Sequence, residues 1–332
     1  MRLSMIVTPF TGENLQLAAQ VGVEEIVAVY PGPGQKPLLK VKREVERHGM
    51  RLTHIERKLP HDQIVHGLSG RDEQVEMIKN LLRDMAEAGL EVLCYNWMPS
   101  EDWCRTTSMN TERGGSYSTA FSVNAEHGNV TDAHGPPQEA TAAACLWDNL
   151  QGFLDEILPV AEEAGIKLAL HPDDPPLKNF WGQDQILCSI DALERVTKLA
   201  PSPSNGVCFC TGSLGASEDN DLLSIIKEFS PRIQFAHLRN VQREKGGGFY
   251  EADHLEGSTN MIEIVKLLIE EESRRRDEGR IDWQFPMRPD HGHLLLDDIL
   301  KETNAGYSAI GRLKGLAELR GVIKTFEHVF EA

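Results

Sequence analysis

Four side chains that commonly bind metal ions follow four successive β-rich segments in the second half of the chain. They are His171 in "HPDDPP", Cys210 in "CFCTG", His237 in "AHLRN" and Asp290 in "MRPDHGH". Two imidazoles, a thiolate and a carboxylate can together hold a divalent cation. Taken one at a time, each has an ordinary structural explanation: a hydrogen-bonded histidine, a small buried cysteine, or an aspartate that caps a helix. Because they recur at four successive segment ends, they predict a metal site.

The segment "NGVCFC" carries two cysteines that must be told apart. In a β-strand Cys208 and Cys210 point to the same face and Phe209 points to the other. The two cysteines lie about 7 Å apart along the strand. A disulfide between them is excluded, because bridged residues have Cα atoms roughly 4.4–6.8 Å apart and converging side chains. We therefore expect Cys210 to be the metal ligand, and Cys208 to lie one layer deeper in the packed interior.

Polar and aromatic residues near the same segment ends could bind an anionic substrate. Arginine is suited to this role because it holds a carboxylate through two parallel hydrogen bonds, although surface ion pairs are an equally ordinary use of arginine. Tyr307, just ahead of the last helical segment, could donate or accept a proton, or could simply be a packed ring. The substrate-binding candidates are Asn96, Trp97, Arg105, Arg239 and Arg288.

The elements that must position these residues form a regular alternation. Each β-rich run is followed by an amphipathic helical run, which is typical of parallel βαβ units, and eight such units favour a closed (β/α)8 TIM barrel. In a barrel of this kind the catalytic groups lie at the carboxyl ends of the strands. The alternative is an open doubly wound sheet, but the expected G-x-G-x-x-G fingerprint does not follow the first strand. The expected strands are Leu3–Thr8, Glu25–Tyr30, Arg51–Glu56, Glu91–Tyr95, Lys167–His171, Gly206–Cys210, Ile233–Leu238 and Gln284–Arg288.

One long insertion interrupts the alternation after the fourth strand. Residues 96–138 are rich in Ser, Thr, Asn and Gly and carry aromatic side chains. A loop of this length in a compact domain usually covers or binds something. We therefore expect residues 1–332 to form a single barrel domain in which residues 96–138 act as a lid. The expected helices lie near 14–21, 38–48, 71–88, 139–164, 190–199, 219–229, 260–279 and from 294 onward.

Composition excludes several classes of partner. The formal net charge of −17 over 332 residues argues against nucleic acid, which needs a basic footprint. No apolar run approaches the roughly 20 residues that cross a bilayer. The six cysteines are scattered without a disulfide pattern, and the N-terminal segment is expected to be a strand rather than a signal peptide, so a reduced cytoplasmic protein is the expectation. A homodimer is the default assembly.

Several long segments resemble one enzyme family. They include "YNWMP", "HPDDPP", "CTGSLGASEDNDL", "REKGGGFYEADHLEG", "MRPDHGH" and "GYSAIGRLKGLAELRG", and they match the metal-dependent mannonate dehydratase family in order from about Leu59 to the C-terminus. The resemblance implies a xylose-isomerase-like barrel. It also implies removal of water from D-mannonate, with Mn²⁺ or Fe²⁺, to give 2-keto-3-deoxy-D-gluconate in hexuronate catabolism.

The resemblance also implies roles for individual residues. His171, Cys210, His237 and Asp290 take the positions of the metal ligands, and the acid–base pair consists of His291 and Tyr307. We provisionally take Tyr307 as the base and His291 as the acid, and the reverse stays open. The thiolate and imidazole donors would also suit Zn²⁺.

The first 55 residues diverge from the family. The segment at 28–39, "AVYPGPGQKPLL", contains neither the histidine nor the tryptophan that the family usually has there. Two alternatives on the same barrel therefore stay open: a dehydratase of a related sugar acid, and a sugar isomerase or epimerase. Isomerase barrels of this type usually bind metal through Glu, Asp and His, so a cysteine ligand favours the dehydratase. A third alternative, a sugar-acid-binding protein without turnover, is disfavoured by the presence of both His291 and Tyr307.

Overall fold

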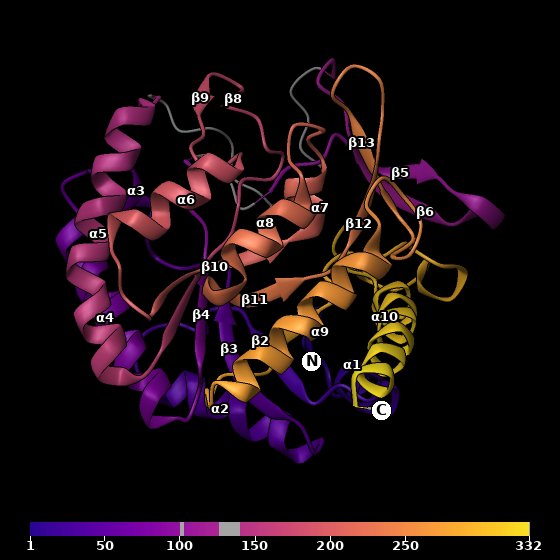
Figure 1. Ribbon diagram of the computed structural model, residues 1–332, viewed down its shortest axis with the longest axis horizontal. Coiled ribbons are helices and arrows are strands. Elements are labelled where there is room, and N and C mark those ends of the chain that lie inside the picture. The colour runs from indigo at the N-terminus through magenta and orange to yellow at the C-terminus, as the bar shows by residue number, and fades with distance from the viewer. Residues whose placement is uncertain (100–102, 126–139, 332) are drawn as a thin grey trace.

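Eight parallel strands close into a barrel with helices around it (Figure 1). The structure is a computed structural model that describes residues 1–99, 103–125 and 140–331. Around the barrel the strands follow the order β1-β14-β11-β10-β7-β4-β3-β2, and this closure confirms the predicted (β/α)8 architecture. The barrel strands are β1 (Arg2–Ile6), β2 (Glu25–Ala28), β3 (Arg51–Glu56), β4 (Val92–Tyr95), β7 (Lys167–Leu170), β10 (Asn205–Cys210), β11 (Ile233–His237) and β14 (Pro286–Arg288).

The helices begin and end at residues whose chemistry favours those ends. Thr11 accepts a hydrogen bond from the Asn14 amide and so caps α1. Gly165 ends the long helix α5 in the left-handed conformation with φ of 69°, where a residue without a side chain is least strained. The helices are α1 (Gly12–Val21), α2 (Gln35–Arg47), α3 (Asp62–His66), α4 (Arg71–Glu87), α5 (Ala143–Ala164), α6 (Ile190–Leu199), α7 (Thr211–Gly215), α8 (Leu222–Phe229), α9 (Met261–Asp277) and α10 (Ala309–Glu331).

The apolar core is divided between the two faces of the barrel wall. Side chains such as Val207 and Phe209 point outward into the large core between strands and helices. Cys208 instead joins a small cluster inside the barrel, together with Cys94 and Ala169. The two faces of β10 therefore separate as the alternation predicts, and Cys208 lies in the packed interior.

A second, antiparallel sheet stands at the upper right of Figure 1, whereas both chain ends lie in the lower half of the view. It contains β5 (Thr107–Thr111) and β6 (Tyr117–Phe121) from the insertion, and β12 (Asn240–Arg243) and β13 (Phe249–Ala252) from the segment after β11. The glycines at 246–248 lie in the turn between β12 and β13. The sequence pattern did not predict this sheet. Part of the predicted lid, at residues 100–102 and 126–138, lies outside the described residues.

A two-stranded hairpin, β8 (Asn179–Phe180) and β9 (Gln183–Asp184), follows β7. Within residues 1–99, 103–125 and 140–331, no helix is both long enough and apolar enough to cross a membrane.

Candidate metal centre and catalytic cavity

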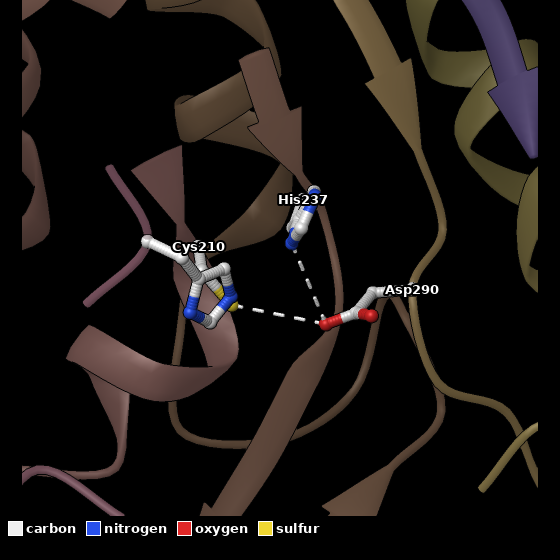
Figure 2. Close-up of side chains that lie close together, drawn as sticks. Cys210, His237 and Asp290 are labelled. Carbon is white, nitrogen blue, oxygen red and sulfur yellow. Dashed lines mark hydrogen bonds and ion pairs between the residues drawn. The ribbon is translucent and has the colours of Figure 1, made fainter. Parts of the chain in front are cut away.

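The four predicted metal ligands lie together at the carboxyl ends of four neighbouring barrel strands. His171 follows β7, Cys210 and His237 end β10 and β11, and Asp290 follows β14. Each offers one ligand atom, and these atoms all lie within 4.8 Å of one another. Figure 2 shows Cys210 and His237 turned toward the Asp290 carboxylate, with Sγ–Oδ2 and Nδ1–Oδ2 distances of 3.8 and 3.9 Å. The four residues that were predicted from the strand ends therefore lie close enough together to share one metal ion.

The Cys210 side chain is fixed by the start of helix α7. Its Sγ accepts hydrogen bonds from the Ser213 amide at 3.4 Å and from the Ser213 hydroxyl at 3.2 Å. Thr211, Gly212 and Ser213 thus form the first turn of the short helix α7. These two hydrogen bonds hold the sulfur atom in place at the end of β10.

Asp290 is held in its ionised form by two buried arginines. Arg239 donates through Nε to Oδ2 at 2.8 Å, and Nη1 of Arg288 lies 2.7 Å from Oδ1. Burial alone would raise the pKa of this carboxyl, but the charge of Arg288 and its neighbours lowers it well below the usual range. Asp290 also has a positive φ of 57°, an uncommon conformation for a residue other than glycine and one that often marks a functional site.

A cavity opens beside these ligands at the rim of the barrel. Its empty volume is about 390 Å³, including the part that is open to solvent. Its lining combines charged groups with aromatic rings. The lining residues are Glu56, Arg57, Cys94, Tyr95, Asn96, Trp103, His171, Asp174, Arg288, Asp290, His291 and Tyr307.

The predicted acid–base pair faces this cavity. The rings of His291 and Tyr307 lie 5.1 Å apart between centroids, and Trp103 packs against both. Nδ1 of His291 lies 2.9 Å from the Glu251 carboxylate. Since a carboxylate accepts, Nδ1 carries the proton and Nε2 keeps its lone pair. The antiparallel sheet thus orients His291, because Glu251 belongs to β13.

The two groups have pKa values displaced in opposite directions. Burial lowers the pKa of His291 below its usual range, although the nearby Asp290 and Glu251 carboxylates partly oppose that shift. Burial raises the pKa of the Tyr307 phenol, and the Arg57 guanidinium 5.2 Å from its ring centroid partly opposes the rise. Near neutral pH the site therefore holds a neutral imidazole beside a protonated phenol.

Two of the predicted substrate-binding arginines lie in a buried ion-pair network instead of lining the cavity. Arg105 binds Asp174 through both Nη atoms at 2.9 and 3.0 Å and reaches Glu251 at 2.7 Å. Arg239 contacts Asp174, Glu251 and Asp290 at 2.6–2.9 Å. Through these ion pairs Arg239 connects Glu251 of the antiparallel sheet to the metal-ligand candidate Asp290.

The other three predicted substrate-binding residues lie in two different places. Arg288 lines the cavity, and so does Asn96. Trp97 lies in the outer core instead, where its indole N–H donates to the Leu146 carbonyl at 3.0 Å and its ring packs 5.2 Å from that of Phe153. Strand alternation explains the difference, because consecutive residues leaving β4 point to opposite sides of the barrel wall.

Four charged residues of the site were missed: Glu56, Arg57, Asp174 and Glu251. Glu56, which ends β3, accepts from Nη2 of Arg288 at 2.8 Å and lies 3.6 Å from Nε2 of His237. Arg57 comes next and reaches the cavity with a positive φ of 69°. The strand-end rule would have found both, had it been applied to β3 as well as to the later strands. Glu251 had no such signal, because its strand lies outside the barrel.

Comparison with known proteins identifies the family. The family model for D-mannonate dehydratase matches residues 12–134 and 138–332. The chain belongs to the mannonate dehydratase family. Mannonate dehydratase 2 of Agrobacterium fabrum is 35% identical over 96% of this chain and 94% of its own length. A mannonate dehydratase of Saccharophagus degradans is also 35% identical, over 95% and 94%.

Solved structures agree with this assignment. The crystal structure of mannonate dehydratase from Streptococcus suis superposes with a TM-score of 0.86 at 32% identity, covering 100% of this chain and 95% of that one. An L-ribulose 3-epimerase superposes with a TM-score of 0.61 at 13% identity, covering 99% and 97%, which shows the shared barrel fold alone. Mannonate dehydratases are metal-dependent hydro-lyases, and the cluster of four ligand residues fits that dependence. The family match begins at residue 12, well before the Leu59 expected from the motifs.

Proposed function

We propose that this protein is a D-mannonate dehydratase that forms 2-keto-3-deoxy-D-gluconate with the aid of a divalent metal ion. The observation that carries the proposal is the meeting of two kinds of group in one cavity. A cluster of metal-competent side chains lies at one end, and His291 and Tyr307 lie beside it with pKa values displaced in opposite directions. Dehydration beside a carboxylate needs both charge stabilisation and a base–acid pair.

His171, Cys210, His237 and Asp290 would hold the metal ion. Their ligand atoms are close enough to share one ion, and Asp290 is ionised. When bound, a divalent cation would stabilise the negative charge that develops on the substrate beside its carboxylate. Of the candidate ions, Mn²⁺ or Fe²⁺ is expected from the family, and Zn²⁺ is the alternative that the thiolate suits.

The protein's own groups would move the protons. Nε2 of His291 would accept the proton from C2, because Glu251 occupies Nδ1 and burial keeps the ring neutral. The electron pair of the C2–H bond would form a C2–C3 double bond as the C3–O bond breaks. The Tyr307 hydroxyl would protonate the departing hydroxide, so that water leaves, and the enol would then become the 2-keto acid. This direction is the reverse of the provisional one from the sequence, because the phenol holds its proton.

Substrate binding would fall to the arginines and the amide that face the cavity. Arg57 and Arg288 line it together with Asn96, and guanidinium groups suit a carboxylate. The walls of the cavity would be held in place by Arg105, Arg239 and Trp97. We also propose that residues 1–332 work as one domain with 96–138 covering the site, in a homodimer within the cytoplasm.

One assay separates this function from its alternatives. The protein is incubated with Mn²⁺ and a panel of hexonates, and the mixture is tested for 2-keto acid. Keto acid from D-mannonate supports the proposal, and keto acid from another hexonate alone would assign a related dehydratase. An isomerised sugar without keto acid would indicate an isomerase or epimerase. A thermal shift without product would indicate a binding protein.

A further inference from the structure

Two buried thiols and an imidazole gather on the inner face of the barrel, one layer below the catalytic ligands. Cys94 on β4, Cys208 on β10 and His237 on β11 each offer a ligand atom, and the three atoms lie within 4.8 Å of one another. Their side chains are at most 1% exposed. The proposed mechanism uses neither of these cysteines.

The barrel brings the two thiols together across an intervening strand. Strands β4 and β10 both pair with β7, and Cys94 lies in register with Ala169 of that strand. Ala169 points into the same inner cluster as the two cysteines. Because alanine projects only a methyl group, space remains above it in which the sulfur atoms of Cys94 and Cys208 approach each other.

This arrangement excludes a disulfide between Cys94 and Cys208 but allows one metal ion to be bound by both sulfur atoms. Two strand spacings separate the backbones, roughly 9–10 Å in a flat sheet, whereas a disulfide needs Cα atoms about 4.4–6.8 Å apart. The backbone of a barrel strand, hydrogen-bonded on both sides, cannot close that gap. An atom bound between the sulfurs can bridge it, since metal–sulfur bonds of about 2.3 Å place two thiolates well apart.

We propose that Cys94, Cys208 and His237 form a second metal site that binds a single thiophilic ion, such as Cd²⁺, Zn²⁺ or Cu⁺. Two thiolates and an imidazole are the donors that soft ions prefer, and Mg²⁺ or Mn²⁺ would gain little from them. The ion would enter through the catalytic cavity, because Cys94 forms part of its lining.

Sharing His237 couples this second site to the catalytic one. His237 belongs to both groups of ligand atoms. An ion held by Cys94 and Cys208 would draw the imidazole away from Cys210 and Asp290, leaving the catalytic ion with fewer ligands. A thiophilic ion would therefore release the catalytic metal without taking its place. This inhibition rests on the proposed function, whereas the existence of the site does not.

A crystal soaked in Cd²⁺ tests the location directly. The expected result is an anomalous difference peak between the sulfur atoms of Cys94 and Cys208. Cadmium found only between Cys210 and Asp290, or only at the surface, would overturn the proposal. This readout requires no activity, so it stands even if the protein fails to dehydrate mannonate.

A titration tests the coupling. Mn²⁺-loaded protein is titrated with Cd²⁺, and released Mn²⁺ is followed by electron paramagnetic resonance. Cys208→Ala should require at least about 10-fold more Cd²⁺ for half release, because loss of one ligand costs no less than loss of an outer-shell partner. Cys145→Ala removes an exposed thiol and should behave as wild type. Equal sensitivity of wild type and Cys208→Ala would mean that cadmium simply replaces manganese at the catalytic ligands.

A second variant covers the risk that alanine disturbs the barrel interior. Cys208→Ser keeps the size and the hydrogen-bonding capacity of the side chain but offers a hard oxygen in place of sulfur. It should show the same resistance to Cd²⁺ as Cys208→Ala. Wild-type sensitivity in a folded Cys208→Ser protein would refute the role of this thiol.

Discussion

The contact between Glu251 and His291 gives a sharp prediction about the antiparallel sheet, to which Glu251 belongs. The Glu251 carboxylate is buried and lies 2.9 Å from Nδ1 of His291, 2.7 Å from Arg105 Nη2 and 2.9 Å from Arg239 Nη1. Glu251→Gln keeps the size of the side chain but removes its charge. The change therefore tests electrostatics and orientation rather than packing.

This substitution should lower both the stability of the protein and its turnover number. Removing one partner from a buried ion pair destabilises a protein by about 3–5 kcal/mol. We expect the lower end, about 3 kcal/mol, because Asp174 still pairs with Arg105 and Arg239. General-base catalysis is typically worth about 10²–10⁴-fold, so we expect kcat to fall by about 10²-fold once the His291 ring loses its orienting partner.

The assay is 2-keto acid formation from D-mannonate with saturating Mn²⁺, together with urea unfolding. Glu244→Gln is the matched control, because Glu244 lies in the same hairpin but is exposed, and it should match wild type in both measurements. A Glu251→Gln protein whose kcat stays within about threefold of wild type would refute the assignment of Glu251 as the residue that orients the base.

Three further predictions follow from the site. The kcat/KM profile should rise through a pKa below about 6.5 and fall through one above about 10, because burial lowers the pKa of His291 and raises that of Tyr307; activity that instead climbs toward pH 10 would make the phenolate the base. The Cys210→Ala protein should lose most of its bound Mn²⁺ by elemental analysis, whereas the Cys208→Ala protein should keep nearly all of it. Equal losses would contradict the placement of Cys210 at the metal and of Cys208 one layer deeper in the barrel. Arg57→Ala should raise KM for mannonate by about 10-fold or more, the loss of one charge-assisted hydrogen bond, and an unchanged KM would exclude a contact with the substrate.

The same Glu251 variant sharpens the pH prediction. The carboxylate beside His291 favours the protonated ring and so raises its pKa. Removing that charge should move the acid limb of the kcat/KM profile to lower pH. A shift to higher pH would mean that the limb belongs to another group.

Much of the barrel could be predicted because its signals are local. Strand β3 (Arg51–Glu56) and helix α6 (Ile190–Leu199) have the predicted bounds, since a short β-rich run after Gly49 and the Ser189 cap are visible within a few residues. The antiparallel sheet could not be predicted in the same way. Its pairing of Phe121 with Phe249 joins residues far apart in sequence, and the exposed strand β5 has no apolar alternation to announce it.

The site was predictable to the extent that its residues lie at the carboxyl ends of the barrel strands. All four metal-ligand candidates end adjacent parallel strands, which is why sequence order alone brought them together. Arg105 and Arg239 lie nearby, but sequence could not show that buried carboxylates surround their donors. Glu251 depends on the unforeseen sheet, so its contact with His291 was out of reach.

Turnover measured against bound metal tests the central claim most directly. The protein is stripped with a chelator, reloaded with graded amounts of Mn²⁺, and assayed for 2-keto acid from D-mannonate. We expect activity near zero without metal and a linear rise with bound Mn²⁺ up to one ion per chain. Full turnover by the stripped protein, with no metal returned, would contradict the account.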